Sequence, residues 1–142
     1  MAYKELEYLD LCSIMIPEAE VDSDGEPTGE IKYNIKFFNQ ECDYQGGMGG
    51  EHKGVVVGYN PKLFLPYKCS ITDLSLDCEV YIVRRFRGKS AFMPNPNTHR
   101  GEFYNFLETY PNVIKAQIED FFEVNIRDKV VGIQIELREV QA

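Results

Sequence analysis

Alternation of apolar and polar residues with a period of two most constrains the fold of this chain. It is clearest over residues 31–37 and again over residues 131–138. Shorter runs rich in β-branched residues occupy positions 55–59 and 80–86, and residues 9–16 favour a further strand. A period of two places one face of a strand against a core and the other in water, which is typical of antiparallel sheets.

Helical periodicity is confined to residues 99–124. Phe103, Phe106 and Leu107 lie at helical spacing. Pro111 suits the first turn of a second helix, where its missing N–H costs little. The apolar stripe of that second helix would consist of Ile114, Ile118, Phe121 and Phe122. The sequence therefore predicts an α+β fold, mainly antiparallel sheet with long hairpin loops, in which one broken helix or a helix pair precedes a final strand.

No internal repeat or long linker divides the 142 residues, so we expect a single domain. Residues 1–30 are an acidic strand-and-loop segment, residues 31–98 are strand-rich with a glycine-rich hairpin, and residues 99–142 hold the helical part and the last strand. Two segments, 17–30 and 39–53, are rich in turn-forming residues and are interpreted as long connections. Connections of this length in a compact domain are commonly functional.

Charge is distributed unevenly along the chain. The formal charge is −8, from 15 Lys and Arg against 23 Asp and Glu. Residues 1–30 contain nine acids and one base, so that segment alone carries −8, whereas residues 80–101 contain five bases and no acid. An extended nucleic-acid coat is excluded, because neutralising phosphates needs an excess of cations. A small anionic ligand or an acidic partner at the basic residues remains compatible with this pattern.

The basic residues of this window are the candidates for an anion or acidic-partner contact. They are Arg84, Arg85, Arg87, Lys89 and Arg100. Arg84 falls on the same strand face as Val80 and Ile82, so it must snorkel, pair with an acid, or mark where that face leaves the core. The alternative is a solvated strand end with paired surface charges, which contribute little. The candidates for the acidic contact are Glu18, Glu20, Asp22, Asp24 and Glu26.

A glycine-rich segment forms a further candidate contact. It consists of Gly46, Gly47, Met48, Gly49 and Gly50, with His52 close behind. A phosphate loop must lead from a strand into a helix N-terminus, whereas a β-branched run follows here. We interpret the segment as a mobile hairpin tip or a partner-contact loop. The acids after Val21 suggest calcium, but Pro27 stands where an EF-hand loop needs glycine, so no metal or cofactor is predicted.

Cysteine and histidine provide the remaining reactive groups. The chain has four cysteines, Cys12, Cys42, Cys69 and Cys78, and two histidines, His52 and His99. No C-x-x-C pair occurs, and in a reducing compartment buried free thiols are favoured over disulfides. A hydrolase with a Cys–His site stays an alternative, because such residues meet in space rather than in sequence. No catalytic motif marks one, and no catalytic residue is predicted.

The start of the chain lacks a secretory signal, and no apolar run reaches the length of a membrane helix. We therefore expect a cytoplasmic protein, or a virion component if viral, without membrane contact. The charge pattern favours a non-enzymatic interaction or assembly protein. It would contact a protein partner or copies of itself through acidic residues 1–30 and basic residues 84–100, as a phage or virion component or a small inhibitor. The alternative is a small-anion, nucleotide or nucleic-acid binding domain that uses the basic residues.

Overall fold

The fold is predominantly antiparallel sheet and broadly of the α+β kind. The computed structural model describes residues 10–46, 49–52, 55–58, 60–66, 68–84, 92–110 and 113–140. For the ranges that begin at 49 and 55 it describes the backbone alone. In chain order the elements are β1 (Asp10–Val21), β2 (Pro27–Gln45), β3 (Gly49–His52), β4 (Val55–Gly58), β5 (Lys62–Pro66), the 3-10 helix η2 (Ile71–Asp73), β6 (Glu79–Val83), α1 (Arg100–Thr109), β7 (Val113–Ile126) and β8 (Lys129–Glu139).

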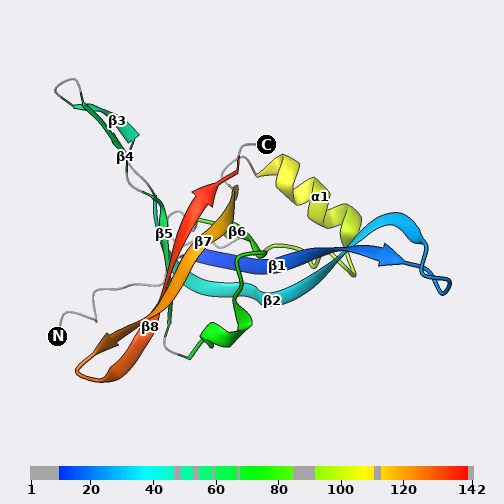
Figure 1. The fold of residues 1–142 in the computed structure, drawn as a ribbon. Coiled ribbons are helices and arrows are strands. Elements are labelled where there is room, and N and C mark those ends of the chain that lie inside the picture. Colours follow the sequence, from blue (N-terminus) through cyan, green and yellow to red (C-terminus); the bar gives the residue numbers. More distant parts are fainter. Residues whose placement is uncertain are drawn as a thin grey trace.

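Most of the strands close into a barrel. Its order is β1-β2-β5-β8-β7-β6, and every neighbouring pair is antiparallel. Strands β3 and β4 pair only with each other and project from the barrel (Figure 1). The alternation predicted for β8 is confirmed, because Ile133, Ile135 and Leu137 face the barrel interior. In β2 a strand forms as predicted, but register shifts place Tyr33 and Ile35 in the cluster under α1 and Phe37 against the barrel core. The interior contains Cys12, Ile14, Cys42, Tyr44, Leu63, Leu65, Val80, Ile82, Ala116, Ile118, Ile133, Ile135 and Leu137.

Bulges in β2 bend the first hairpin. Between the partners of Cys12 and Ile14, β2 contains one residue more than β1. Asn39 lies there with a φ of 48°, and its backbone N–H donates to Ser13 Oγ at 3.0 Å. Asparagine tolerates this left-handed conformation better than most residues. A bulge bends its strand and increases the local twist, so β2 can both close the barrel and extend beyond it.

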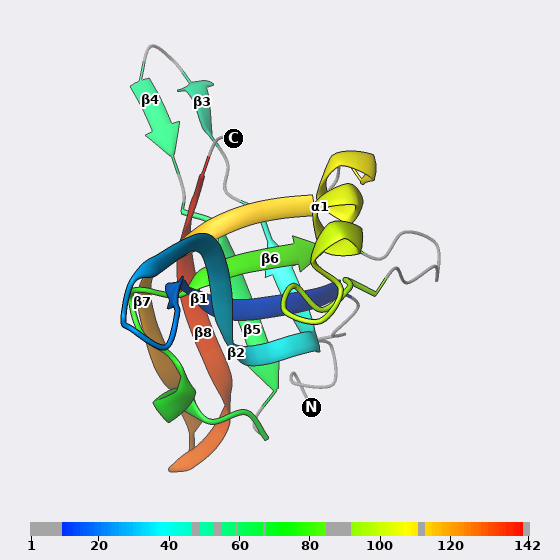
Figure 2. The same cartoon turned by 90° about the vertical axis from the view of Figure 1, so that its right-hand side faces the viewer.

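Helix α1 covers the outside of the barrel, as the spacing of Phe103 and Phe106 predicts. Both residues are buried in a second apolar cluster with Met15, Tyr33, Tyr81, Val83 and Met93. The ring of Phe103 meets that of Tyr81 edge to face, with centroids 5.7 Å apart. The helix lies outside the barrel beside the ends of β6 and β7 (Figure 2). The barrel wall is therefore buried on both faces where α1 covers it.

The prediction of a second helix over residues 111–124 is wrong, since β7 occupies this region. Ile114 and Ile118 are four residues apart, a spacing that fits a helix and also a strand of period two. Ala116 between them is fully buried in the barrel, which only the strand period allows. A register shift after Ile118 then turns Phe121 toward the barrel core, so the apolar pattern imitates a helical stripe.

The two long connections predicted over residues 17–30 and 39–53 are also largely wrong. In the first, only residues 22–26 lie between β1 and β2, which pair with each other as expected of a hairpin. In the second, β2 continues to Gln45 and β3 begins at Gly49. An exposed two-stranded ribbon has polar residues on at least one face, and its composition therefore resembles that of a loop.

Candidate functional site

The first hairpin extends beyond the barrel as a two-stranded arm, which we define as residues 16–34. Pairing of β6 with β1 ends at Met15, and pairing of β5 with β2 covers only residues 43–45. Beyond those points β1 and β2 pair with each other alone, and the arm projects at the right of Figure 1. An isolated two-stranded ribbon is marginally stable in water at best.

The tip of the arm is a turn shaped by one of the candidate acids. Asp22 Oδ1 accepts the backbone N–H groups of Asp24 and Glu26, both at 2.9 Å. Gly25 has a φ of 79°, a conformation that glycine adopts without steric cost. The carboxylate of Asp22 therefore has a structural role, whereas those of Asp24 and Glu26 are exposed at the tip. The structure thus brings the candidate acids together on the arm.

The strand register sorts the arm into two faces. Ala19 is paired with Ile31, and Val21 with Pro27, so apolar residues oppose one another. Directly opposed residues in an antiparallel pair project from the same face. Ile31 is 42% exposed and Val21 is 55% exposed, which is unusual for residues of their size. Toward the barrel this face continues into Tyr33, whose ring meets that of Phe103 at 5.7 Å.

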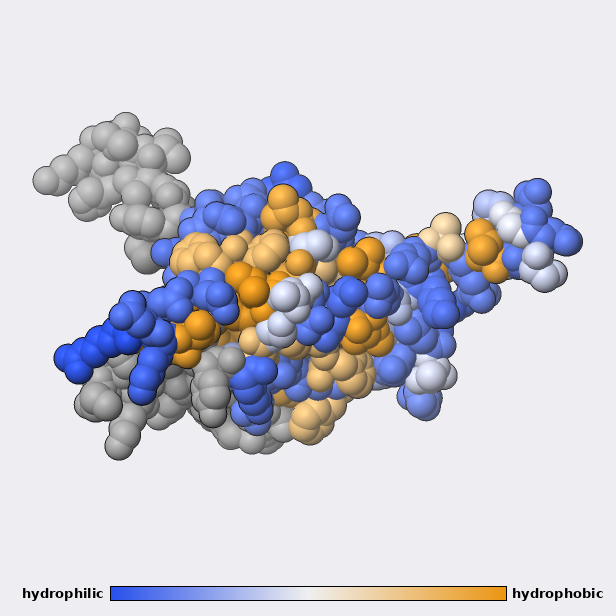
Figure 3. All heavy atoms as spheres, turned by 60° about the horizontal axis from the view of Figure 1, so that its bottom comes forward, coloured by the Kyte–Doolittle hydropathy of each residue, from blue (hydrophilic) through white to orange (hydrophobic). Residues whose placement is uncertain are grey.

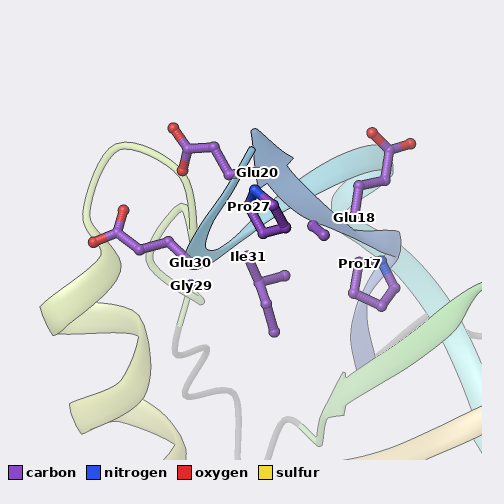
Figure 4. A pocket seen from close by; sticks show the side chains of 8 residues that line it. Pro17, Glu18, Glu20, Pro27, Gly29, Glu30 and Ile31 are labelled. Carbon is purple, nitrogen blue, oxygen red and sulfur yellow. The ribbon is translucent and has the colours of Figure 1, made fainter. Parts of the chain in front are cut away.

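A hollow of about 360 Å³ lies on the arm. Its apolar lining comes from Pro17, Ala19, Pro27 and Ile31, and the rest from Gly29 and three glutamates. Ile31 points toward one side of the ribbon, while the carboxylates of Glu18 and Glu20 point toward the other (Figure 4). Figure 3 shows that the arm, at the right, is largely hydrophilic with a small apolar group between the polar residues.

Arg100 connects both strands of the arm to the start of α1. Its guanidinium hydrogen-bonds Glu30 Oε2 and lies 3.6 Å from Glu20 Oε2. The hydrogen bond to Glu30 raises the pKa of Arg100, so the group stays charged. One candidate of the basic window is therefore paired, within the same chain, with acids of the arm.

Arg84 pairs with a different acid. It follows the last residue of β6, and its Nε lies 3.9 Å from Asp10 Oδ1. Its guanidinium carbon lies 5.7 Å from the centre of the Tyr44 ring. The side chain of Arg84 is 57% exposed. Two of the three alternatives derived from the sequence therefore hold together: Arg84 pairs with an acid, and it marks the place where its strand face leaves the core. Arg85, Arg87 and Lys89 lie outside the described residues.

The glycine-rich candidate is described only in part. Gly46 is exposed after β2, while residues 47 and 48 lie outside the described ranges. Gly49, Gly50 and His52 belong to β3, which forms its own small sheet with β4. The glycine-rich segment thus leads into a strand and not into a helix, as a phosphate loop would require.

Of the residues considered for a Cys–His site, the structure describes the side chains of the four cysteines and of His99, but not that of His52. Cys12, Cys42 and Cys78 are buried free thiols, as the sequence predicts. A hydrogen bond with Cys12 and burial raise the pKa of Cys42, which favours the unreactive thiol. His99 is exposed at the start of α1, and its Nδ1 lies 2.9 Å from Thr98 Oγ1.

Two asparagines that the sequence did not single out hold the loop before α1 against β2. The side chain of Asn97 accepts the N–H of Tyr33 and donates to its carbonyl, both at 2.8 Å. Asn39 makes the same reciprocal pair with the backbone of Met93, at 3.1 and 2.9 Å. We call these two pairs the amide clasps. In the sequence this loop is marked only by the alternation of proline and asparagine from 94 to 97, which is typical of a stiff loop.

Comparisons with protein-family models, with curated proteins and with solved structures gave no match. Among the described residues, no group of three or more His, Cys, Asp or Glu side chains is arranged to hold a metal ion. The helices described here are too short or too polar to cross a bilayer. The arm with its hollow is the feature of the described structure that calls for a functional explanation.

Proposed function

We propose that the protein is a non-enzymatic interaction or assembly protein that makes protein–protein contacts through the arm. The observation that supports this is the apolar face of the arm, which leaves the cluster under α1 and ends uncovered at Val21 and Ile31. The barrel closes without this part of the hairpin. A partner that covers the face would bury it, which explains why an otherwise marginal ribbon is retained.

The chemistry of the arm favours a cationic partner. Residues 16–34 contain six acids and one base, a formal charge of −5. Copies of the same chain offer the acid-free basic window as the complement. A contact between two different surfaces of identical chains is heterologous, and repetition produces rings or open filaments. This mode suits a component of a phage or other particle, or a small inhibitor, working in the cytoplasm or in a virion.

The ion pairs favour assembly over binding of a small anion. To bind an anion, Arg84 would have to weaken its pair with Asp10, and Arg100 its pairs with Glu20 and Glu30. An acidic or polar protein partner can instead exchange such contacts over a broad surface. Anion binding by the basic window therefore remains the second hypothesis.

Light scattering coupled to size exclusion tests the proposal. We expect oligomers at low salt that dissociate near 1 M salt, where the Debye length is about 3 Å. Replacement of three exposed arm acids, E18Q/D24N/E26Q, should weaken association at least tenfold. The variant E102Q/E108Q/E123Q removes the same charge elsewhere and should assemble like the wild type. Monomers at every salt and protein concentration would overturn self-assembly.

A further inference from the structure

The apolar hollow on the arm is a candidate site for a side chain of a partner molecule. Beside the apolar lining of Ala19, Pro27 and Ile31 lie Glu18, Glu20 and Glu30, of which Arg100 pairs with the last two, and residues 16–34 as a whole carry a formal charge of −5. Large apolar side chains that enter a pocket with a charged rim are common anchors of protein interfaces. The occupant should therefore combine an apolar anchor with neighbouring positive charge.

A second arm does not meet this requirement. Two arms could cover each other's apolar faces, but each carries −5 over residues 16–34. Like charges brought together in an interface cost several kcal/mol and discriminate against that pairing. An isologous arm-to-arm dimer is therefore disfavoured by electrostatics.

The chain has a suitable anchor at another place. Phe92 is 62% exposed, and Phe38 is 40% exposed. Both lie next to the clasp between Asn39 and Met93, so they belong to one part of the barrel surface. Phe92 also lies in the window 80–101, which contains five bases and no acid. The chain thus carries the hollow and, within a basic stretch of its sequence, an exposed aromatic side chain that could serve as the anchor.

The same molecule cannot fill its own hollow with this anchor. The two amide clasps hold the segment from Met93 to Asn97 along β2, from Asn39 to Tyr33. The four residue steps from Met93 to Asn97 span at most about 14 Å at roughly 3.6 Å per residue. Phe92 is therefore fixed at one end of this segment, while Ile31 and the hollow lie beyond the other end. The contact must form between molecules.

We propose that the hollow on the arm receives Phe92 from a second copy of the chain. This inference rests on the proposed function and names the residues of its interface. Each copy would then use its arm on one neighbour and its Phe92 on another, so the contact is heterologous and repeats.

Mixed cross-linking between two cysteine variants tests this pairing. Chains with A19C are mixed with chains with F92C and oxidised, with the wild type as a control for its native thiols. We expect a cross-linked dimer of one A19C chain and one F92C chain, and little product from either variant alone. Efficient cross-linking of A19C to itself would overturn the proposal, because the occupant would then be a second arm.

Equilibrium sizing of serine variants provides the energetic test. We expect F92S and I31S each to raise the dissociation constant of the assembly at least tenfold, because a few large side chains at the centre of an interface contribute most of its binding free energy. The matched variants L76S and F122S replace exposed apolar residues elsewhere, of 60% and 40% exposure, and should assemble normally. If the arm-acid variant loses assembly but F92S does not, this contact is wrong while the proposed function stands.

Discussion

At the scale of single residues, the clasp of Asn97 replaces strand pairing that β2 lacks, whereas the clasp of Asn39 satisfies the backbone of Met93 in the loop. Along the base of the arm β2 pairs with β1 on one side only, and its other edge would leave backbone groups without protein partners. The side chain of Asn97 offers a donor and an acceptor at the spacing of a peptide group, and so does that of Asn39. These positions therefore require asparagine because its side-chain amide donates one hydrogen bond and accepts another; a side chain that is merely polar would not be sufficient.

Replacement of Asn97 with aspartate should destabilise the protein. The introduced carboxylate keeps an acceptor for the N–H of Tyr33 but has no donor for the carbonyl of Tyr33, and it would face that oxygen. A partly buried group left without its partner costs about 1–3 kcal/mol. Urea denaturation should show this loss for N97D, while N105D, at an exposed position of α1, should change little. Equal urea midpoints for N97D and N105D would contradict a stabilising contribution from the hydrogen bonds between Asn97 and Tyr33.

At the scale of elements, the sequence predicted those strands whose alternation is uninterrupted. Strand β8 alternates without a break from Ile133 to Leu137, and its pattern was correct. The sequence of β7 resembles that of a helix, because a register shift after Ile118 interrupts the period of two. The charge pattern of the sequence was enough to select the acids of the arm as candidate contact residues, but it gave no indication of the apolar face of the arm. The pairing of Ala19 with Ile31 depends on a register that bulges in β2 displace.

The strand assignment of β7 makes a prediction that a helix would not make. Ile118 is 4% exposed and faces the barrel interior, whereas Phe122 is 40% exposed. I118A should cost about 2–5 kcal/mol, because it removes buried methyl groups and leaves a cavity. F122A should change the free energy of unfolding by about 0.5 kcal/mol or less. In a helix both residues would share one apolar stripe, and similar large losses in urea denaturation would indicate that arrangement.

At the scale of the whole molecule, buried tyrosine hydroxyls bond to carboxylates of the barrel strands. The hydroxyl of Tyr81 donates to Glu79 at 2.8 Å, and that of Tyr44 donates to Glu139 at 2.6 Å. Burial raises the pKa of both tyrosines, and the hydrogen bonds to these carboxylates raise it further. Burial also raises the pKa of Tyr33 to about 12, with a further contribution from its hydrogen bond to Tyr104. The folded state thus retains these protons more strongly than the unfolded state does.

Stability should therefore fall at alkaline pH. Below pH 10 the hydroxyls are protonated in both states, and the stabilisation is fully present. As pH rises from 10 to about 12, the unfolded chain releases protons that native Tyr33 still holds, so the free energy of unfolding falls. Urea midpoints between pH 8 and 12 should show this decline, and Y33F should reduce it. Y110F, at a residue 44% exposed, should leave the decline unchanged.

The two-residue repeat of the arm limits how its length can change. Each strand advances about 3.4 Å per residue, and adding one residue to a strand would move every later side chain to the opposite face. An insertion that keeps Ala19 and Ile31 on one face must therefore add residues in pairs to both strands, in increments of about 7 Å. If copies join through the arm, the spacing between them can vary among related chains only in discrete increments, while the closed barrel stays the same.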